Sequence, residues 1–79
     1  MYNSDTRIKT IRLEYISDVY KFVELASKAE DRVEVTTGTF TVDGASLMGM
    51  FSIDPSKKFT VEYPSSAKEF DKFISQFTV

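Results

Sequence analysis

The hydroxyl group of Ser46 is the side chain whose place in the sequence most clearly suggests chemistry. It follows a polar turn at residues 43–45 and precedes a short apolar run, residues 47–53, which ends before Pro55. A serine at a helix start caps backbone N–H groups and stabilises the helix by about 1 kcal/mol. The same place would stabilise a phosphate, because the N–H groups and the helix dipole attract a dianion. Ser46 is therefore interpreted in two ways, as a helix N-cap and as a candidate phosphorylation site.

The apolar residues behind Ser46 fall into two sectors of a short helix. At about 100° per residue, one sector holds Leu47, Met48 and Phe51, and the other holds Met50 and Ile53. If the second sector joins the core, the first forms a partly exposed patch, and patches that contain methionine are typical of surfaces that bind partners. The alternative is a tilted helix that buries most of both sectors. The first interpretation makes Leu47, Met48 and Phe51 candidate partner-binding residues.

The sequence contains no histidine and no cysteine. This composition excludes the common zinc sites, the Ser/His/Asp and Cys/His nucleophile systems and a phosphohistidine. Carboxylates, lysines and tyrosines remain for acid–base chemistry, but no pair of them has a spacing that suggests a site. They are interpreted as solvent-exposed surface groups. We therefore expect no catalytic residue, no metal ion, no cofactor and no enzymatic activity.

Length and charge limit the remaining functions. The 79 residues are expected to form one domain, with residues 1–6 as a flexible tail. Twelve acidic and ten basic residues give a net charge of −2, and the basic residues form no block that could follow a phosphate backbone. No apolar run approaches the roughly 20 residues that cross a bilayer. We expect a cytoplasmic protein that binds neither nucleic acid nor membrane.

Alternation and helical spacing predict the elements that position this stretch. Residues 10–15 alternate as a strand with Ile11, Leu13 and Tyr15 on its buried side. A helix is expected to follow, with Ser17 as its N-cap and its end near residue 30 or 31. Its apolar residues recur at spacings of three and four, at Val19, Phe22, Val23, Ala26 and Ala29.

Two short runs rich in β-branched residues follow, at residues 33–37 and 40–42. They are predicted to form an antiparallel hairpin, because Gly38 can supply the positive φ of a tight turn. Residues 59–63 alternate as a fourth strand that ends at Pro64.

The last predicted element is a helix that begins with a capping box formed by Ser66 and Glu69. Its apolar face consists of Phe70, Phe73, Ile74 and Phe77. The predicted fold is α+β, with element order β-α-β-β-α-β-α. It is an open-faced sandwich, in which a four-stranded antiparallel sheet is covered on one face by two helices and a short third helix.

This order of elements resembles HPr, the histidine-containing phosphocarrier protein family of the bacterial sugar phosphotransferase system. Residues 45–53 read Ala-Ser-Leu-Met-Gly-Met-Phe-Ser-Ile, which is closely similar to the run Lys-Ser-Ile-Met-Gly-Val-Met-Ser-Leu of Gram-positive members. The run Phe-Val-Glu-Leu-Ala at residues 22–26 and the lengths of the later elements extend the resemblance over about residues 10–77. In those members an ATP-dependent kinase phosphorylates the serine that matches Ser46. The apolar residues that match Leu47, Met48 and Phe51 contact partner enzymes and a transcriptional regulator.

The sequence departs from this family at the phosphocarrier site. The family's histidine stands at the start of the first helix in a Gly-Leu-His-Ala-Arg-Pro type motif, whereas residues 14–18 read Glu-Tyr-Ile-Ser-Asp. Tyr15 or Ser17 could occupy the position near the lost histidine, but a phosphate ester on oxygen lacks the transfer potential of a phosphoramidate. Glu14 and Asp18 would also repel a phosphate there. Ala45 replaces the usual basic residue before the regulatory serine.

Three functions are consistent with this sequence. The first, which we favour, is a non-catalytic regulatory or protein-docking module that keeps the partner face of an HPr-like domain. Its expected partners are phosphotransferase-system enzymes, a serine kinase or a transcriptional regulator. The second is a phosphocarrier that uses an atypical acceptor such as Tyr15. The third is a structural domain with an unrelated partner and no phosphate chemistry.

Overall fold

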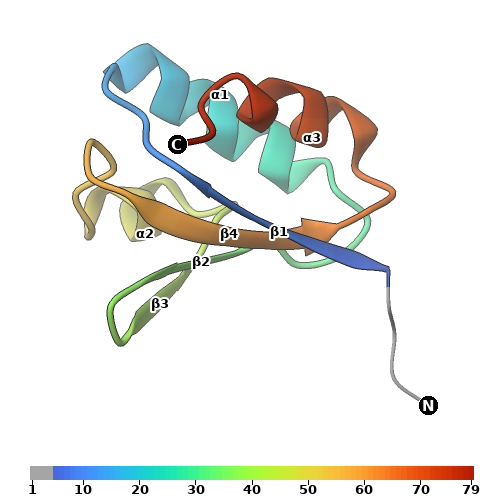
Figure 1. Ribbon diagram of the computed structural model, residues 1–79, viewed down its shortest axis with the longest axis horizontal. Helices are drawn as coiled ribbons and strands as arrows, with labels where there is room; N and C mark the ends of the chain where they lie inside the picture. Colours follow the sequence, from blue (N-terminus) through green and yellow to red (C-terminus); the bar gives the residue numbers. More distant parts are fainter. Residues whose placement is uncertain (1–4) are drawn as a thin grey trace.

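The computed structural model describes residues 5–79 and has the predicted order of strands and helices. The strands are β1 (Thr6–Ile11), β2 (Glu34–Thr37), β3 (Phe40–Asp43) and β4 (Phe59–Pro64), and the helices are α1 (Ile16–Ser27), α2 (Leu47–Phe51) and α3 (Lys68–Ser75). The strands form one antiparallel sheet in the order β1-β4-β2-β3. Figure 1 shows α1 and α3 side by side on one face of this sheet. The prediction of an α+β open-faced sandwich is confirmed.

The two faces of the sheet follow from alternation along its central strand, β4. Phe59, Val61 and Tyr63 are buried under the helices, whereas Thr60 and Glu62 point to the other face. That other face carries two rows of residues paired in register across the strands. One row is Thr10, Thr60, Thr36 and Thr41, and the other is Ile8, Glu62, Glu34 and Asp43. The uncovered face is thus mainly polar, with Ile8 as an exposed apolar residue on it.

Aromatic side chains join the helices to the sheet. Phe22 of α1 contacts Phe59 and Phe70 edge to face, with ring centroids 6.0 and 5.0 Å apart.

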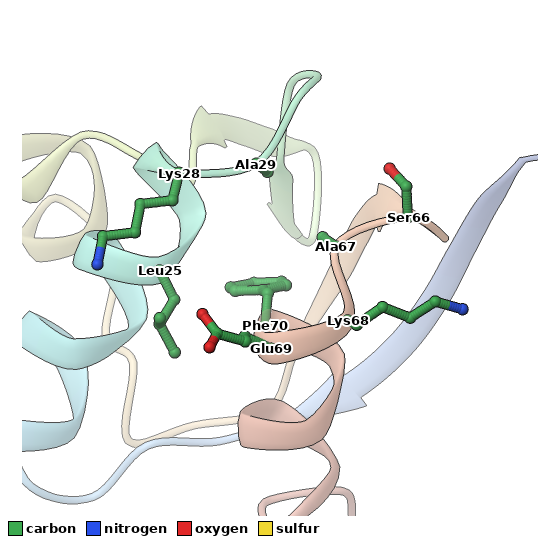
Figure 2. Close-up of a pocket in the computed structure, with 8 residues that line it drawn as sticks. All are labelled: Leu25, Lys28, Ala29, Ser66, Ala67, Lys68, Glu69 and Phe70. Carbon is green, nitrogen blue, oxygen red and sulfur yellow. The ribbon is translucent and has the colours of Figure 1, made fainter.

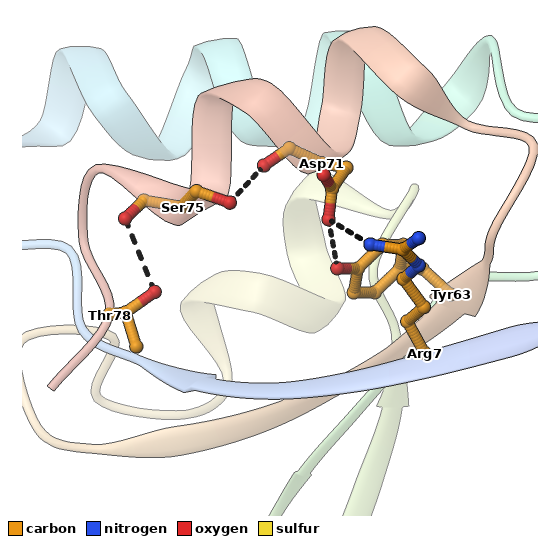
Figure 3. A network of polar contacts seen from close by, with 5 residues as sticks. All are labelled: Arg7, Tyr63, Asp71, Ser75 and Thr78. Atoms are coloured by element: carbon orange, nitrogen blue, oxygen red, sulfur yellow. Dashed lines mark hydrogen bonds and ion pairs between the residues drawn. The ribbon is translucent and has the colours of Figure 1, made fainter.

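The hydroxyl group of Tyr63 donates a hydrogen bond to the Asp71 carboxylate of α3, and Arg7 of β1 lies 3.9 Å from the same carboxylate (Figure 3). Burial and this hydrogen bond raise the pKa of Tyr63 above its ordinary value. Tyr63 therefore remains a neutral donor that ties α3 to β4.

Strand β1 lies earlier in the chain than residues 10–15, so that prediction was wrong in position. Ile11 and Leu13 are both buried, as the alternation predicted, but Tyr15 is exposed because it lies beyond the strand, at the N-cap of α1. Pairing ends at Ile11, however, because its partner Phe59 is the first residue of β4. The backbone N–H of Leu13 donates instead to the Pro55 carbonyl, 2.7 Å away. The predicted tail at residues 1–6 lies mainly outside the described residues, and Thr6 is already the first residue of β1.

Both long helices begin with caps that differ from the predicted ones. Tyr15, and not Ser17, is the N-cap of α1, and Ala67 is the N-cap of α3. Neither makes a side-chain capping bond, so the predicted capping box is absent. Ser66 donates instead to the Glu30 carboxylate, with its Oγ 3.2 Å from Oε1. Helix α1 also ends at Ser27, before the predicted residue 30 or 31.

The hairpin and the buried helix faces agree with the predictions. Gly38 has a φ of 61° between β2 and β3, which is the left-handed conformation that a glycine adopts without a steric penalty. On α1 and α3 the fully buried residues are Val19, Phe22, Ala26, Phe70 and Ile74. The other predicted apolar residues pack against this core and are partly buried, namely Val23, Ala29, Phe73 and Phe77.

Candidate functional site

Ser46 is the N-cap of α2, so the first interpretation of this residue is confirmed. Its backbone is extended, and its Oγ accepts a hydrogen bond from the Gly49 N–H at 3.0 Å. The turn before it is also fixed, because the Asp43 carboxylate accepts from the Ala45 N–H at 2.9 Å. The Asp43 carbonyl accepts from the Ser46 N–H at 3.0 Å. Phosphorylation of Ser46 stays a prediction.

Ser46→Ala is expected to lower the free energy of unfolding by about 1 kcal/mol, the usual value of an N-cap. Urea denaturation followed by circular dichroism measures this loss. Ser52→Ala is the matched control, because Ser52 Oγ donates to the Gly49 carbonyl at the exposed other end of α2. That control should change stability by less than about 0.5 kcal/mol. Equal losses in the two variants would contradict a specific capping role for Ser46.

The two apolar sectors of α2 are separated only in part as predicted, because Leu47, which was predicted in the exposed sector, packs against the core. Met50 is fully buried, whereas the Met48 side chain is 85% exposed and Phe51 is 44% exposed. Leu47 and Ile53 are partly buried and pack against the core. The sector that contains Met50 therefore packs against the core, and the other sector presents Met48 and Phe51 to solvent.

Helix α1 extends this exposed apolar surface. Tyr20 contacts Phe51 edge to face, with ring centroids 6.1 Å apart. Tyr15 and Ile16 line a hollow of about 200 Å³ together with Phe51. Met48 lies one helical turn before Phe51. We call Tyr15, Ile16, Tyr20, Met48 and Phe51 the α1–α2 face.

Ile16 and Tyr20 were not among the predicted site residues. Val19 and Phe22 belong to the buried stripe of α1, whereas Tyr20 lies between them in the sequence and is exposed. Its side chain therefore projects away from that stripe. The sequence did contain one indication of this site residue, because Tyr20 is an aromatic residue that lies outside the apolar stripe of an amphipathic helix. The position of Tyr20 beside Phe51 depends on how α1 packs against α2, and the spacing of residues within one helix cannot predict that packing.

The start of α1 holds Tyr15 but is poorly suited to a phosphate. Tyr15 is 69% exposed. It lines a cavity of about 230 Å³ together with Arg12, Glu14 and Asp18, and Ser17 does not line it. Arg12 already faces a carboxylate, because its Nε lies 3.5 Å from Glu14 Oε2. A phosphoryl group on Tyr15 would therefore meet two carboxylates and one cation that is already paired.

Carboxylates also border the hollow beneath Phe51. Glu14 and Asp54 line it together with Tyr15 and Ile16. The Ser56 hydroxyl and backbone N–H both donate to Asp54 Oδ1, at 2.6 and 3.1 Å. These bonds lower the pKa of Asp54 below its ordinary value, and Lys57 lowers it further. The α1–α2 face is thus an apolar surface with an acidic border.

Within residues 5–79 there is no group of three or more acidic, histidine or cysteine side chains that could hold a metal ion. The helices of this same part of the chain are all too short or too polar to cross a membrane. The chain matches no known family model, no curated protein and no solved structure.

Proposed function

We propose that this protein is a non-catalytic regulatory or docking module of the HPr type, which binds a protein partner through the α1–α2 face. The observation that carries this proposal is the gathering of exposed apolar side chains. Within residues 5–79, eight large hydrophobic side chains are exposed, and five of them belong to this face. Contiguous apolar surface on a small protein is typical of an interaction site. The similarity of residues 45–53 to the regulatory run of HPr proteins supports the same choice.

The proposed partners are phosphotransferase-system enzymes, a serine kinase or a transcriptional regulator in the bacterial cytoplasm. Phosphorylation of Ser46 would regulate such binding. It would place a dianion at the start of α2, next to Leu47 and two residues before the exposed Met48. A charge there would favour a partner with a basic group and would weaken binding to a purely apolar surface.

Met48→Asp is expected to weaken partner binding about tenfold or more while the melting temperature stays within a few degrees of the unmodified protein. Isothermal titration calorimetry measures the binding to each of three proteins: enzyme I of the phosphotransferase system, the serine kinase and the transcriptional regulator. Ile8→Thr is the matched control, because Ile8 is 64% exposed on the uncovered face of the sheet. It removes an exposed apolar side chain elsewhere, so it should leave binding unchanged.

Each other outcome of this experiment favours a different function. Equal weakening by Met48→Asp and Ile8→Thr would contradict docking through the α1–α2 face. No binding to any of the three proteins would favour the structural domain with an unrelated partner. Incubation with phosphoenolpyruvate and enzyme I tests the phosphocarrier alternative. A labile phosphoryl adduct that disappears in Tyr15→Phe would replace the docking proposal with phosphoryl transfer.

A further inference from the structure

A second surface, separate from the α1–α2 face, lies between α1 and α3. A groove of about 420 Å³ is lined by Lys21, Leu25, Lys28, Glu69, Lys72, Phe73 and Gln76. A neighbouring hollow of about 260 Å³ shares Leu25, Lys28 and Glu69, and it continues to Ala67 and Phe70 at the start of α3 (Figure 2). Together the two hollows follow α3 over its whole length. Eight residues of helix span about 12 Å.

The floor of this groove is formed by one partly buried apolar side chain from each helix. Leu25 and Phe73 face it from the two helices, and both are partly buried against the core. Alanines at positions 29 and 67 leave room at the end shown in Figure 2. Tyr63 is the only fully buried side chain among residues 5–79 that carries a polar group, and it does not line the groove, so the floor offers no enclosed hydrogen-bonding group for a small ion. The floor instead suits an apolar side chain that enters from outside.

The border of the groove is basic, although the whole chain has a net charge of −2. Lys21, Lys28 and Lys72 line it, against the single carboxylate of Glu69. The Nζ atom of Lys28 lies 3.8 Å from Oε2 of Glu24, so this lysine already has an acidic partner. Lys21 and Lys72 form no ion pair with the residues that the structure describes. Two unpaired ammonium groups therefore stand on opposite sides of an apolar floor, one on each helix.

We infer that the groove between α1 and α3 binds an acidic peptide segment that carries one or two apolar anchor side chains. The anchors would contact Leu25 and Phe73, and carboxylates of the peptide would pair with Lys21 and Lys72. A membrane surface fits less well, because the apolar residues are partly buried and do not project as an inserting face would. Apolar anchors with charged neighbours are the usual way in which a peptide segment occupies a groove between helices. The inference does not depend on the function proposed for the α1–α2 face.

The test uses the full chain labelled with 15N and a synthetic peptide of about twelve residues, rich in Glu and Asp, with two leucines four residues apart. We expect saturable changes in the amide resonances of α1 and α3. Lys21→Glu combined with Lys72→Glu should weaken binding about tenfold or more, and added salt should weaken it as well. The control is Lys57→Glu combined with Lys58→Glu, which makes the same change of charge on exposed lysines before β4. It should bind the peptide nearly as tightly as the unmodified chain.

Several results would overturn the inference. Equal weakening by the two double variants would show that binding depends only on net charge. A peptide with serines in place of both leucines should bind at least tenfold more weakly, and undiminished binding would exclude an apolar anchor. Tight binding to vesicles of phosphatidylserine and phosphatidylcholine without peptide binding would indicate a membrane surface. Self-association that Lys21→Glu with Lys72→Glu abolishes would identify a second copy of the chain as the occupant. Absence of saturable changes would also contradict the inference.

Discussion

Met50→Ala is expected to lower the free energy of unfolding by about 3 kcal/mol, because the Met50 side chain is fully buried. Helix α2 has only five residues, and a helix this short is unstable without tertiary contacts. Met50 is its only fully buried residue. Domains of this size have total stabilities of about 5–15 kcal/mol. The variant should therefore lose a large part of its stability, with α2 affected first.

Urea denaturation measures this loss, and Met48→Ala is the matched control on the same helix. Met48 is 85% exposed, so its truncation should change stability by less than about 0.5 kcal/mol. Hydrogen exchange should show faster exchange of the Met50 amide in Met50→Ala, since that N–H donates to the Ser46 carbonyl at 2.9 Å. Similar losses in the two variants would mean that α2 packs in a different rotation about its axis.

The sequence could predict this division of α2 because periodicity alone separates its two sectors. It could likewise predict the hairpin and β4, where the positive φ at Gly38 and the alternation of Phe59, Val61 and Tyr63 are local properties. The position of β1 was not predictable in this way. Alternation correctly identified Ile11 and Leu13 as buried. The residues that pair are set by where β4 begins, and that is a property of two distant segments.

Helix starts and the full α1–α2 face also required the folded chain. Ser17 is a better N-cap than Tyr15 by local preference, yet α1 begins at Ile16. The Tyr15 carbonyl accepts hydrogen bonds from the N–H groups of Asp18 and Val19, at 3.0 and 3.3 Å, so the helix starts before Ser17. For the α1–α2 face, helical spacing alone predicted Met48 and Phe51 as exposed apolar residues. Tyr20 joins them only because α1 and α2 pack together, which brings its ring to Phe51.

Gly44→Ala is expected to lower the free energy of unfolding by about 2 kcal/mol, as overpacked core positions commonly do. A Cβ atom at Gly44 would lie 2.7 Å from Val33 Cγ1 and 3.3 Å from Phe22 Cε1. The backbone cannot easily move away, because the Gly44 N–H donates to the Val33 carbonyl at 2.7 Å. Gly44 also stands two residues before Ser46, so a shift there would disturb the turn that starts α2.

A double-mutant cycle with Val33→Ala tests the cause of this loss. Val33→Ala removes the Cγ1 atom that the new methyl group would approach, so the double variant should be more stable than the sum of the single losses by about 1 kcal/mol. Gly38→Ala is the control for a glycine that is needed for its backbone conformation. Nothing lies within 4 Å of a Cβ placed at Gly38, and its φ is +61°, so its loss should not depend on Val33. Strict additivity of Gly44→Ala and Val33→Ala in urea denaturation would show that close packing against Val33 is not the reason for a glycine at position 44.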